Sequence, residues 1–218
     1  MTILVIGEEN NLKECQAKFG GSNHYQFVSN HTDAKEYFTS DVVVLDFIIE
    51  AHRQAIEVYS SHSIPVFLNS SMTTLAELRD KSVSQAVFFG FCGIPSFLNR
   101  EILEVVVRSE DHQRLKSVCD SLKTQFAIVE DNVGLVTPRI ICMIINEAYF
   151  VVQENVASRS DIDLAMKLGT NYPFGPFEWC DKIGIKNVSN LLKAVYESAG
   201  DERYKICKLL EEEAKNFA

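Results

Sequence analysis

The chain has 218 residues, a net charge of −9 and 46% apolar residues, and this composition excludes several classes of protein. The apolar share allows a buried core and argues against intrinsic disorder, which combines low hydrophobicity with high net charge. The acidic balance argues against a nucleic-acid partner bound through a broad cationic face. With 10 glycines and 5 prolines, a loop-rich all-β protein is also disfavoured.

Six cysteines are spread along the chain, and no two of them form a Cys-x-x-Cys pair. This spacing argues against a zinc ribbon or a thioredoxin-type motif, so we expect no metal site. The stretch after Met1, Thr-Ile-Leu-Val-Ile, lacks the pattern of a signal peptide. No apolar run approaches the ~20 residues of a membrane span, so no membrane partner is expected. We therefore expect mostly buried, reduced thiols and a cytoplasmic setting.

Short apolar runs alternate with helical patterns in the first part of the chain. The runs predict strands at Thr2–Gly7, Tyr25–Ser29, Asp41–Phe47, Ile64–Leu68, Gln85–Phe91, Ile102–Val107 and Phe126–Val129. The patterns between them predict helices at about 9–19, 48–60 and 110–123. Strands and helices that alternate in this way imply a parallel sheet covered by helices on both faces.

Only helical periodicity remains beyond about residue 131. The run that starts at Pro138 is apolar almost all round, which predicts a buried helix. Thr137 is a favourable N-cap for it, and Pro138 is a favoured first helical residue. Ser158 precedes Asp161 with the spacing of a capping box, which predicts a second helix start. We expect two domains, an α/β domain at 1–130 and a helical domain at 131–218.

Three motifs after Gly134 are specific enough to indicate a family. They are Asn146-Glu147-Ala148, Asp161–Gly169 (DIDLAMKLG) and Tyr172–Phe177 (YPFGPF). With them the segment closely resembles the C-terminal helical domain of 3-hydroxyacyl-CoA dehydrogenases. NSSMTT at 69–74, and GFC at 90–92 followed by EILEVV at 101–106, resemble the first domain of that family more weakly. The resemblance implies a Rossmann-like parallel sheet, shortened between its second and third strands, followed by an all-α dimerisation domain.

The family oxidises a 3-hydroxyacyl-CoA to the 3-ketoacyl-CoA and passes hydride to NAD. In the family register Ser71 falls on a substrate-positioning serine, and Glu104 falls on the glutamate that orients a histidine base. Cys92 falls on that histidine, and Pro138 falls on an asparagine. A free thiol has a pKa of ~8.5, and burial near Glu104 would raise it, so Cys92 is expected to be a poor base at pH 7.

The turn after the first predicted strand reads Gly7-Glu8-Glu9-Asn10-Asn11-Leu12. A Rossmann dinucleotide site needs Gly-x-Gly-x-x-Gly there, so that the backbone can approach the diphosphate. Gly7 provides the first glycine, but Glu9 and Leu12 replace the other two. Their bulk and the acidic charge oppose NAD binding. Asn30 stands where the family fold would place an acid for the ribose hydroxyls, and an amide binds them more weakly.

Three interpretations remain open from the sequence. The preferred one is a short, divergent family member with weak or lost dehydrogenase activity, which binds an acyl-CoA-like small molecule or a partner chain. The second is an active NAD-dependent dehydrogenase with a rearranged site. The third is a non-catalytic dimerising subunit. The resemblance implies a homodimer formed through 131–218, and Trp179 is either a core or an interface residue.

Overall fold

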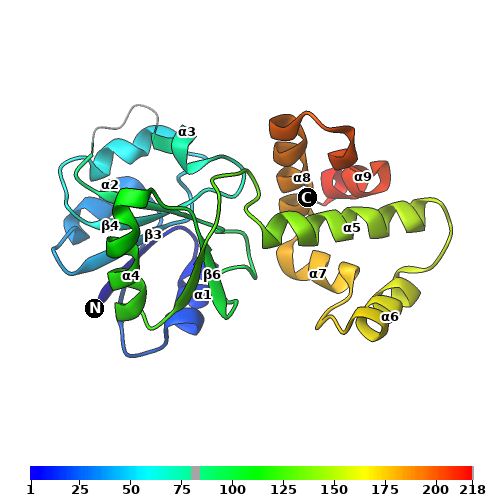
Figure 1. Ribbon diagram of the computed structural model, residues 1–218, viewed down its shortest axis with the longest axis horizontal. Helices are drawn as coiled ribbons and strands as arrows, with labels where there is room; N and C mark the ends of the chain where they lie inside the picture. The colour runs from blue at the N-terminus through cyan, green and yellow to red at the C-terminus, as the bar shows by residue number, and fades with distance from the viewer. Residues whose placement is uncertain (80–83, 218) are drawn as a thin grey trace. The chain divides into compact units, whose positions relative to one another are not determined.

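A computed structural model describes residues 1–79 and 84–217, which fall into two compact units, Met1–Leu135 and Val136–Ala218 (Figure 1). The division lies a few residues beyond the predicted one at 130/131. The reason is Asp131, whose carboxylate accepts the backbone N–H groups of Leu75 and Ala76, each at 2.8 Å. These are the first residues of helix α3 (Leu75–Arg79), so the segment that carries Asp131 belongs to the first unit.

The first unit is built on a parallel sheet, in which the described strands have the order β2-β1-β3-β4-β5. They are β1 (Thr2–Ile6), β2 (His24–Val28), β3 (Val42–Asp46), β4 (Pro65–Asn69) and β5 (Val87–Phe91). Every residue of β3 and β4 is buried, as in a parallel sheet covered on both faces. The parallel Rossmann-like sheet is thus confirmed, and each of these strands matches its prediction to within two residues.

The last two strands do not extend this sheet. β6 (Ile102–Val105) and β7 (Gln125–Ile128) pair with each other in parallel as a separate ribbon. An antiparallel bridge between Gly90 and Val106 joins the ribbon to β5. The connection 92–101 explains this arrangement, because a parallel neighbour needs a crossover of about a dozen residues or more. Two strands predicted from their apolar runs therefore exist, but they form a second sheet.

Helices α1 (Glu9–Phe19) and α4 (His112–Ser121) lie close to where the periodicity predicts them, and α2 (His31–Ala34) is a single turn. Short 3₁₀ turns occur at Lys35–Tyr37 and Ser109–Asp111. The helix predicted at 48–60 is wrong, because only a 3₁₀ helix at Arg53–Tyr59 forms there. The chain before it forms turns, in which the Ala51 and His52 N–H groups donate to carbonyls three residues back, and Glu50 in this segment accepts the backbone N–H of Met72 at 2.6 Å.

The second unit is helical, as predicted. Its described helices are α5 (Thr137–Gln153), α6 (Arg159–Thr170), α7 (Pro176–Ile183), α8 (Ile185–Ala199) and α9 (Lys208–Asn216), with a 3₁₀ turn at Glu202–Tyr204. Ser158 caps α6 as expected, since its hydroxyl accepts the Asp161 N–H at 3.2 Å. The N-cap predicted at Thr137 is wrong by one residue. Val136 is the N-cap, because its carbonyl already accepts the Ile140 N–H at 3.1 Å.

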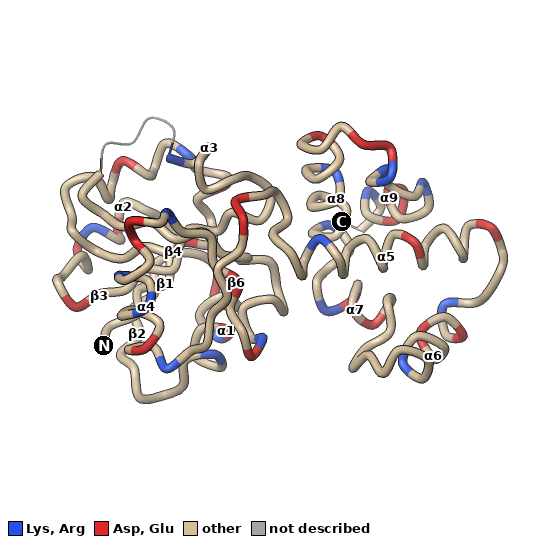
Figure 2. Tube along the Cα trace, viewed as in Figure 1, with Lys and Arg blue, Asp and Glu red and all other residues tan. Residues whose placement is uncertain are grey.

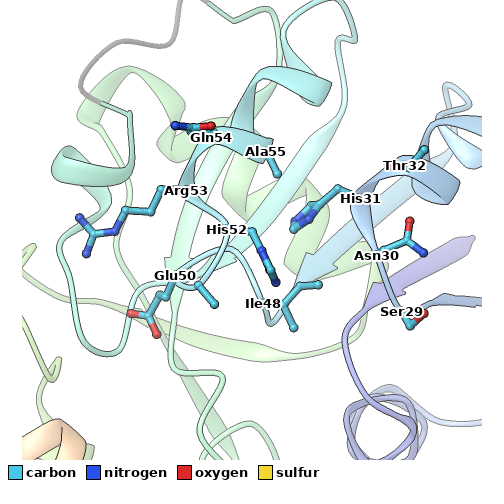
Figure 3. Close-up of a pocket in the computed structure, with 11 residues that line it drawn as sticks. Ser29, Asn30, His31, Thr32, Ile48, Glu50, His52, Arg53, Gln54 and Ala55 are labelled. Atoms are coloured by element: carbon cyan, nitrogen blue, oxygen red, sulfur yellow. The ribbon is translucent and has the colours of Figure 1, made fainter.

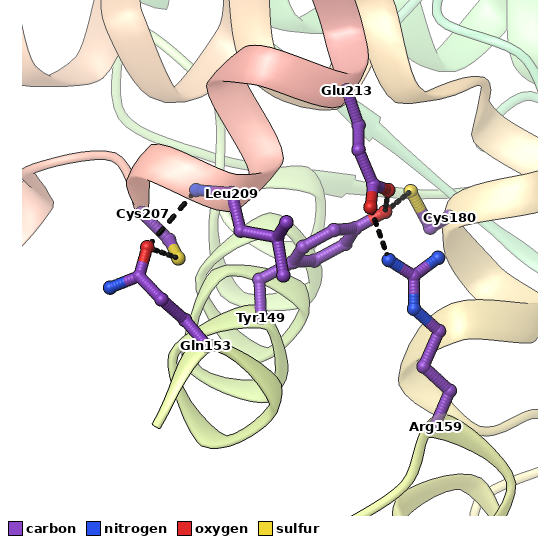
Figure 4. Close-up of polar contacts among 7 residues, drawn as sticks. All are labelled: Tyr149, Gln153, Arg159, Cys180, Cys207, Leu209 and Glu213. Atoms are coloured by element: carbon purple, nitrogen blue, oxygen red, sulfur yellow. Dashed lines mark hydrogen bonds and ion pairs between the residues drawn. The ribbon is translucent and has the colours of Figure 1, made fainter. Parts of the chain in front are cut away.

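Polar side chains tie the helices of this unit together (Figure 4). Tyr149 on α5 donates its hydroxyl to Glu213 on α9 at 3.2 Å, and Arg159 at the start of α6 donates to the other oxygen of Glu213. Gln153 accepts the Leu209 N–H at 3.1 Å and the Cys207 thiol at 3.3 Å. These contacts fix both ends of the α6–α9 segment to α5.

Asn146 makes a similar link inside the unit, and we expect its replacement to lower the stability of the unit. Its amide donates to the Lys205 carbonyl and accepts the Cys207 N–H, both at 2.9 Å, and the side chain is 2% exposed. Asn146→Ala leaves both backbone groups without this partner, which should lower the free energy of unfolding by about 1–3 kcal/mol. Urea unfolding followed by Trp179 fluorescence measures it. The exposed Asn190→Ala is the control, with an expected change within about 0.5 kcal/mol.

Charges of both signs are interspersed along each unit (Figure 2). None of the helices that the structure describes has the length and apolar character needed to cross a membrane.

Candidate functional site

The carboxyl ends of β4 and β5 bring two of the predicted site residues together. Ser71 follows β4, Cys92 follows β5, and the strands pair in parallel with Asn69 beside Phe91. The Ser71 Oγ and the Cys92 Sγ consequently lie 3.4 Å apart, and both side chains are buried. Glu104 lies on β6 and is half-buried. The negative charge of Glu104 contributes to raising the pKa of the Cys92 thiol, after the larger effect of burial.

Asn69 connects this pair to the surrounding chain. Its Oδ1 accepts the Ser71 hydroxyl at 2.5 Å and the Gly93 N–H at 2.9 Å. Its Nδ2 donates to the Glu50 carboxylate at 3.0 Å. A Cβ on Gly93 would come within 2.8 Å of the Asn69 side chain, so only glycine allows this close approach. Sequence reasoning missed Asn69 and Glu50, although Asn69 opens the NSSMTT segment on which the resemblance partly rests.

Cys92 has the electrostatics of an inert thiol. Burial raises the pKa of Cys92 to about 12, and the carboxylates of Glu50 and Glu104 act in the same direction. The hydrogen bond with Ser71 lowers this pKa but does not offset the effect of burial. The thiol is therefore protonated at pH 7 and cannot accept a proton from a substrate hydroxyl.

Glu50 is the second perturbed group. Burial raises the pKa of Glu50 to about 7, although the backbone N–H groups of Met72 and Thr73 lower it. With Asn69 and Met72 bonded to its two oxygens, the carboxylate holds the turn after β4 in place.

Pro138 lies in the second unit, buried in the first turn of α5. It has no polar side-chain atom and no backbone N–H, so it cannot supply the hydrogen bonds of an asparagine. The structure does not assign it a place beside Ser71 and Cys92.

The turn after β1 is closed by its own side chains. Asn11 accepts the Glu8 N–H through Oδ1 at 2.8 Å, and the same oxygen would lie 2.5 Å from a Cβ on Gly7. Glu8 and Glu9 are exposed at the start of α1, whereas Leu12 is half-buried against the core. A helix N-terminus binds phosphate through unoccupied N–H groups. Here the Asn11 amide oxygen already holds the Glu8 N–H, and the acidic Glu8 and Glu9 stand at the helix start, so these residues do not fit a diphosphate.

Asn30 lies at the end of β2 and uses its side chain for the backbone. Its Oδ1 accepts the Asp33 N–H at 3.0 Å, and its Nδ2 donates to the Asp33 carboxylate at 2.9 Å. Asn30 thus caps α2 and has little capacity left for a ribose. It also lines a cavity of about 690 Å³, formed by Ser29–Thr32 after β2 and by Ile48 and Glu50–Ala55 after β3 (Figure 3).

All six cysteines are buried free thiols. Among the residues that the structure describes, no three His, Cys, Asp or Glu side chains are grouped so that they could hold a metal ion.

Comparison with known proteins shows which family this chain resembles. Residues 134–216 match the model of the 3-hydroxyacyl-CoA dehydrogenase C-terminal domain. A 3-hydroxyadipyl-CoA dehydrogenase of Escherichia coli is 43% identical over 86 residues, which are 39% of this chain and 18% of that protein. A 3-hydroxybutyryl-CoA dehydrogenase of Bradyrhizobium diazoefficiens is 32% identical over 148 residues, 64% of this chain and 48% of the relative. The chain therefore spans less than half the length of these relatives.

Solved structures agree in fold over nearly the whole chain. FadB2 of M. tuberculosis has a TM-score of 0.77 at 15% identity. The match covers 99% of this chain and 93% of FadB2. The (S)-3-hydroxybutyryl-CoA dehydrogenase PaaH1 of Ralstonia eutropha has a TM-score of 0.71 at 18% identity, with coverages of 99% and 93%. The matched C-terminal domain and the curated relatives therefore support a member of the 3-hydroxyacyl-CoA dehydrogenase family, and the solved structures show the same fold over nearly the whole chain.

Proposed function

We propose that this chain is a family member in which the NAD-dependent oxidation of 3-hydroxyacyl-CoA is weak or lost. The observation that carries the proposal is Cys92. In the register of the resemblance it falls on the histidine base, and burial keeps its thiol protonated at neutral pH. A base contributes ~10²–10⁴-fold to the rate of such a reaction, so its loss alone removes most of the activity.

The turn after β1 supports the same conclusion. NAD is the cofactor that family membership implies, and when bound it would accept a hydride. In this chain Asn11 occupies the N–H group of Glu8, and the carboxylates of Glu8 and Glu9 repel a diphosphate. The function that we propose for the chain is then the binding of an acyl-CoA-like small molecule or of a partner chain. The six buried free thiols favour a reducing setting such as the cytoplasm.

An NADH titration by calorimetry, with and without acetoacetyl-CoA, tests this proposal on the whole chain. We expect no heat of binding for NADH up to millimolar concentration, while a working dehydrogenase of the family serves as the positive control. Micromolar binding of NADH, followed by its oxidation with acetoacetyl-CoA, would instead support the active enzyme with a rearranged site.

The helical unit supports a second element of the proposal, a homodimer formed through it. None of the α6 residues is buried, and Leu164 and Leu168 are 54% and 77% exposed. Val156, just before α6, is 69% exposed. Apolar side chains that recur on one helix and stay open to solvent are typical of an interaction surface. A non-catalytic dimerising subunit would use the same surface.

We expect Leu168→Glu to convert this dimer to a monomer. A carboxylate at the most exposed of these positions would have to lose its hydration in the interface, and unpaired buried charges are strongly unfavourable. Size-exclusion chromatography with light scattering measures the mass. Lys193→Glu on α8, which is exposed and polar already, is the control and should leave the dimer intact. A monomeric unaltered chain at micromolar concentration would contradict the homodimer.

A further inference from the structure

A second cavity of the first unit, with a volume of about 440 Å³, lies between helix α3 and the segment that follows strand β6. It is lined by Leu75, Ala76 and Arg79 of α3, by residues 106–108 after β6, and by Asp131. None of these residues lines the cavity of Figure 3. Aliphatic side chains and two guanidinium groups therefore meet at one place on an acidic chain.

Arg79 is the charged group of this cavity that has no ion-pair partner among the residues described by the structure. The side chain is half-buried, and its guanidinium carbon lies 5.4 Å from the centre of the buried Phe88 ring. Burial lowers the pKa of Arg79, and the positive charge of Arg108 acts in the same direction. A guanidinium nevertheless stays charged at neutral pH. A cation that has lost part of its hydration without gaining an ion pair is stabilised when an anion binds to it.

The other charged groups around the cavity already have partners. Arg108 forms an ion pair with Glu110. The two carboxylate oxygens of Asp131 each accept a backbone N–H at the start of α3, at 2.8 Å. Asp111 is the N-cap of α4, where the helix start offsets its negative charge. Asp111 and Glu110 act on Arg79, but the effect of each on its pKa is smaller than that of Arg108. One positive charge is therefore left for a ligand, which suits a monoanion.

We propose that this cavity binds a small monocarboxylate with an apolar body, whose carboxylate pairs with the guanidinium of Arg79. The planar guanidinium presents parallel N–H groups that match the two oxygens of a carboxylate. The apolar body lies against Leu75, Val106 and Val107, and the burial of apolar surface there adds to the affinity. A volume of about 440 Å³ is in the range of small-molecule sites. The site is independent of the proposed function, since it uses neither Cys92 nor the turn after β1.

The test is an NMR titration of the whole chain that follows the Nε–H signal of Arg79 and the methyl signals of Leu75, Val106 and Val107. Benzoate and hexanoate are the carboxylates, benzamide is the neutral counterpart, and inorganic phosphate is an anion without an apolar body. We expect at least one carboxylate to shift both sets of signals, and benzamide to bind about tenfold more weakly or worse, because it loses the charge-assisted hydrogen bonds. The proposal is overturned if neither carboxylate shifts both sets, if benzamide binds as well as benzoate, or if phosphate binds more tightly than both carboxylates.

Two variants test the role of Arg79 in different ways. Arg79→Gln removes the charge and should weaken carboxylate binding about tenfold or more. Arg114→Gln, at an exposed arginine of α4, is the matched control and should leave the affinity unchanged.

Ala76→Glu keeps Arg79 but places a carboxylate in the cavity. Ala76 is exposed, and a glutamate is favourable in the first turn of a helix, so this variant should fold. It should bind the carboxylates more weakly than its neutral counterpart Ala76→Gln, because the new carboxylate competes for Arg79 and repels the ligand. Unchanged affinity in folded Arg79→Gln, or equal affinity in the two Ala76 variants, would refute the role of Arg79.

Discussion

Cys92→His is expected to raise the acetoacetyl-CoA-dependent oxidation of NADH by less than the ~10²–10⁴-fold that a general base contributes. An imidazole at residue 92 would restore a base that titrates near neutral pH. The charge of Glu104 would act on it, as it acts on the Cys92 thiol. The thiol it replaces stays protonated until the pH approaches its pKa of about 12. The gain is nevertheless limited, because the turn after β1 still carries Glu9 and Leu12. The measurement is the initial rate at 340 nm.

A combined variant tests that limit directly. Adding Glu9→Gly and Leu12→Gly to Cys92→His gives residues 7–12 the Gly-x-Gly-x-x-Gly pattern, and the rate should rise further. Cys142→His, at a buried cysteine of the other unit, is the matched control and should leave the rate at background. Since Leu12 packs against the core, circular dichroism must first show that the combined variant is folded. Rapid turnover by Cys92→His alone would contradict the role we assign to the turn.

The sequence predicts the strands well because their apolar runs are long and nearly free of polar residues. Val42–Leu45 is such a run, and it forms the centre of the sheet. The sequence predicts less well where tertiary contacts override a local pattern. Residues 48–60 have helical periodicity, but the segment forms turns and a 3₁₀ helix, and Glu50 in it contacts the distant Met72 backbone. Similarly, the apolar run of β6 does not reveal that the short connection from β5 prevents a parallel neighbour.

The candidate site, too, could be predicted from the sequence only in part. The register of the resemblance places Ser71 and Cys92 on neighbouring strands, and their side chains meet in the structure. Asn69, which links them to Glu50, follows from no spacing rule, because its role depends on the close approach of Gly93. The contact between the His31 Nε2 and the Asp46 Oδ2, which lie 2.8 Å apart, could not be predicted from the sequence either. They are brought together by the β2-β1-β3 strand order, which places the ends of β2 and β3 on either side of β1.

Asp46→Ala is expected to destabilise the first unit more than other single polar substitutions there. It leaves His31 and the Tyr59 hydroxyl without an acceptor in a site where Asp46 is 0% exposed. A buried donor left without its acceptor costs about 1–3 kcal/mol, and Asp46→Ala removes the acceptor of more than one. Urea unfolding followed by far-ultraviolet circular dichroism should show this as a lower midpoint for the sheet-containing unit, with Trp179 fluorescence reporting the helical unit separately.

Asp41→Ala is the matched control, because Asp41 lies just before β3 and is exposed. Its carboxylate accepts the Thr39 hydroxyl at 2.7 Å, which lowers the pKa of Asp41, but water replaces that contact when the side chain is removed. The midpoint should therefore not change. Since Asp41 precedes β3 and Asp46 is its last residue, a difference between the two variants separates the effect of burial from that of removing a carboxylate. Equal midpoints for both would mean that water reaches Asp46 and replaces its lost contacts.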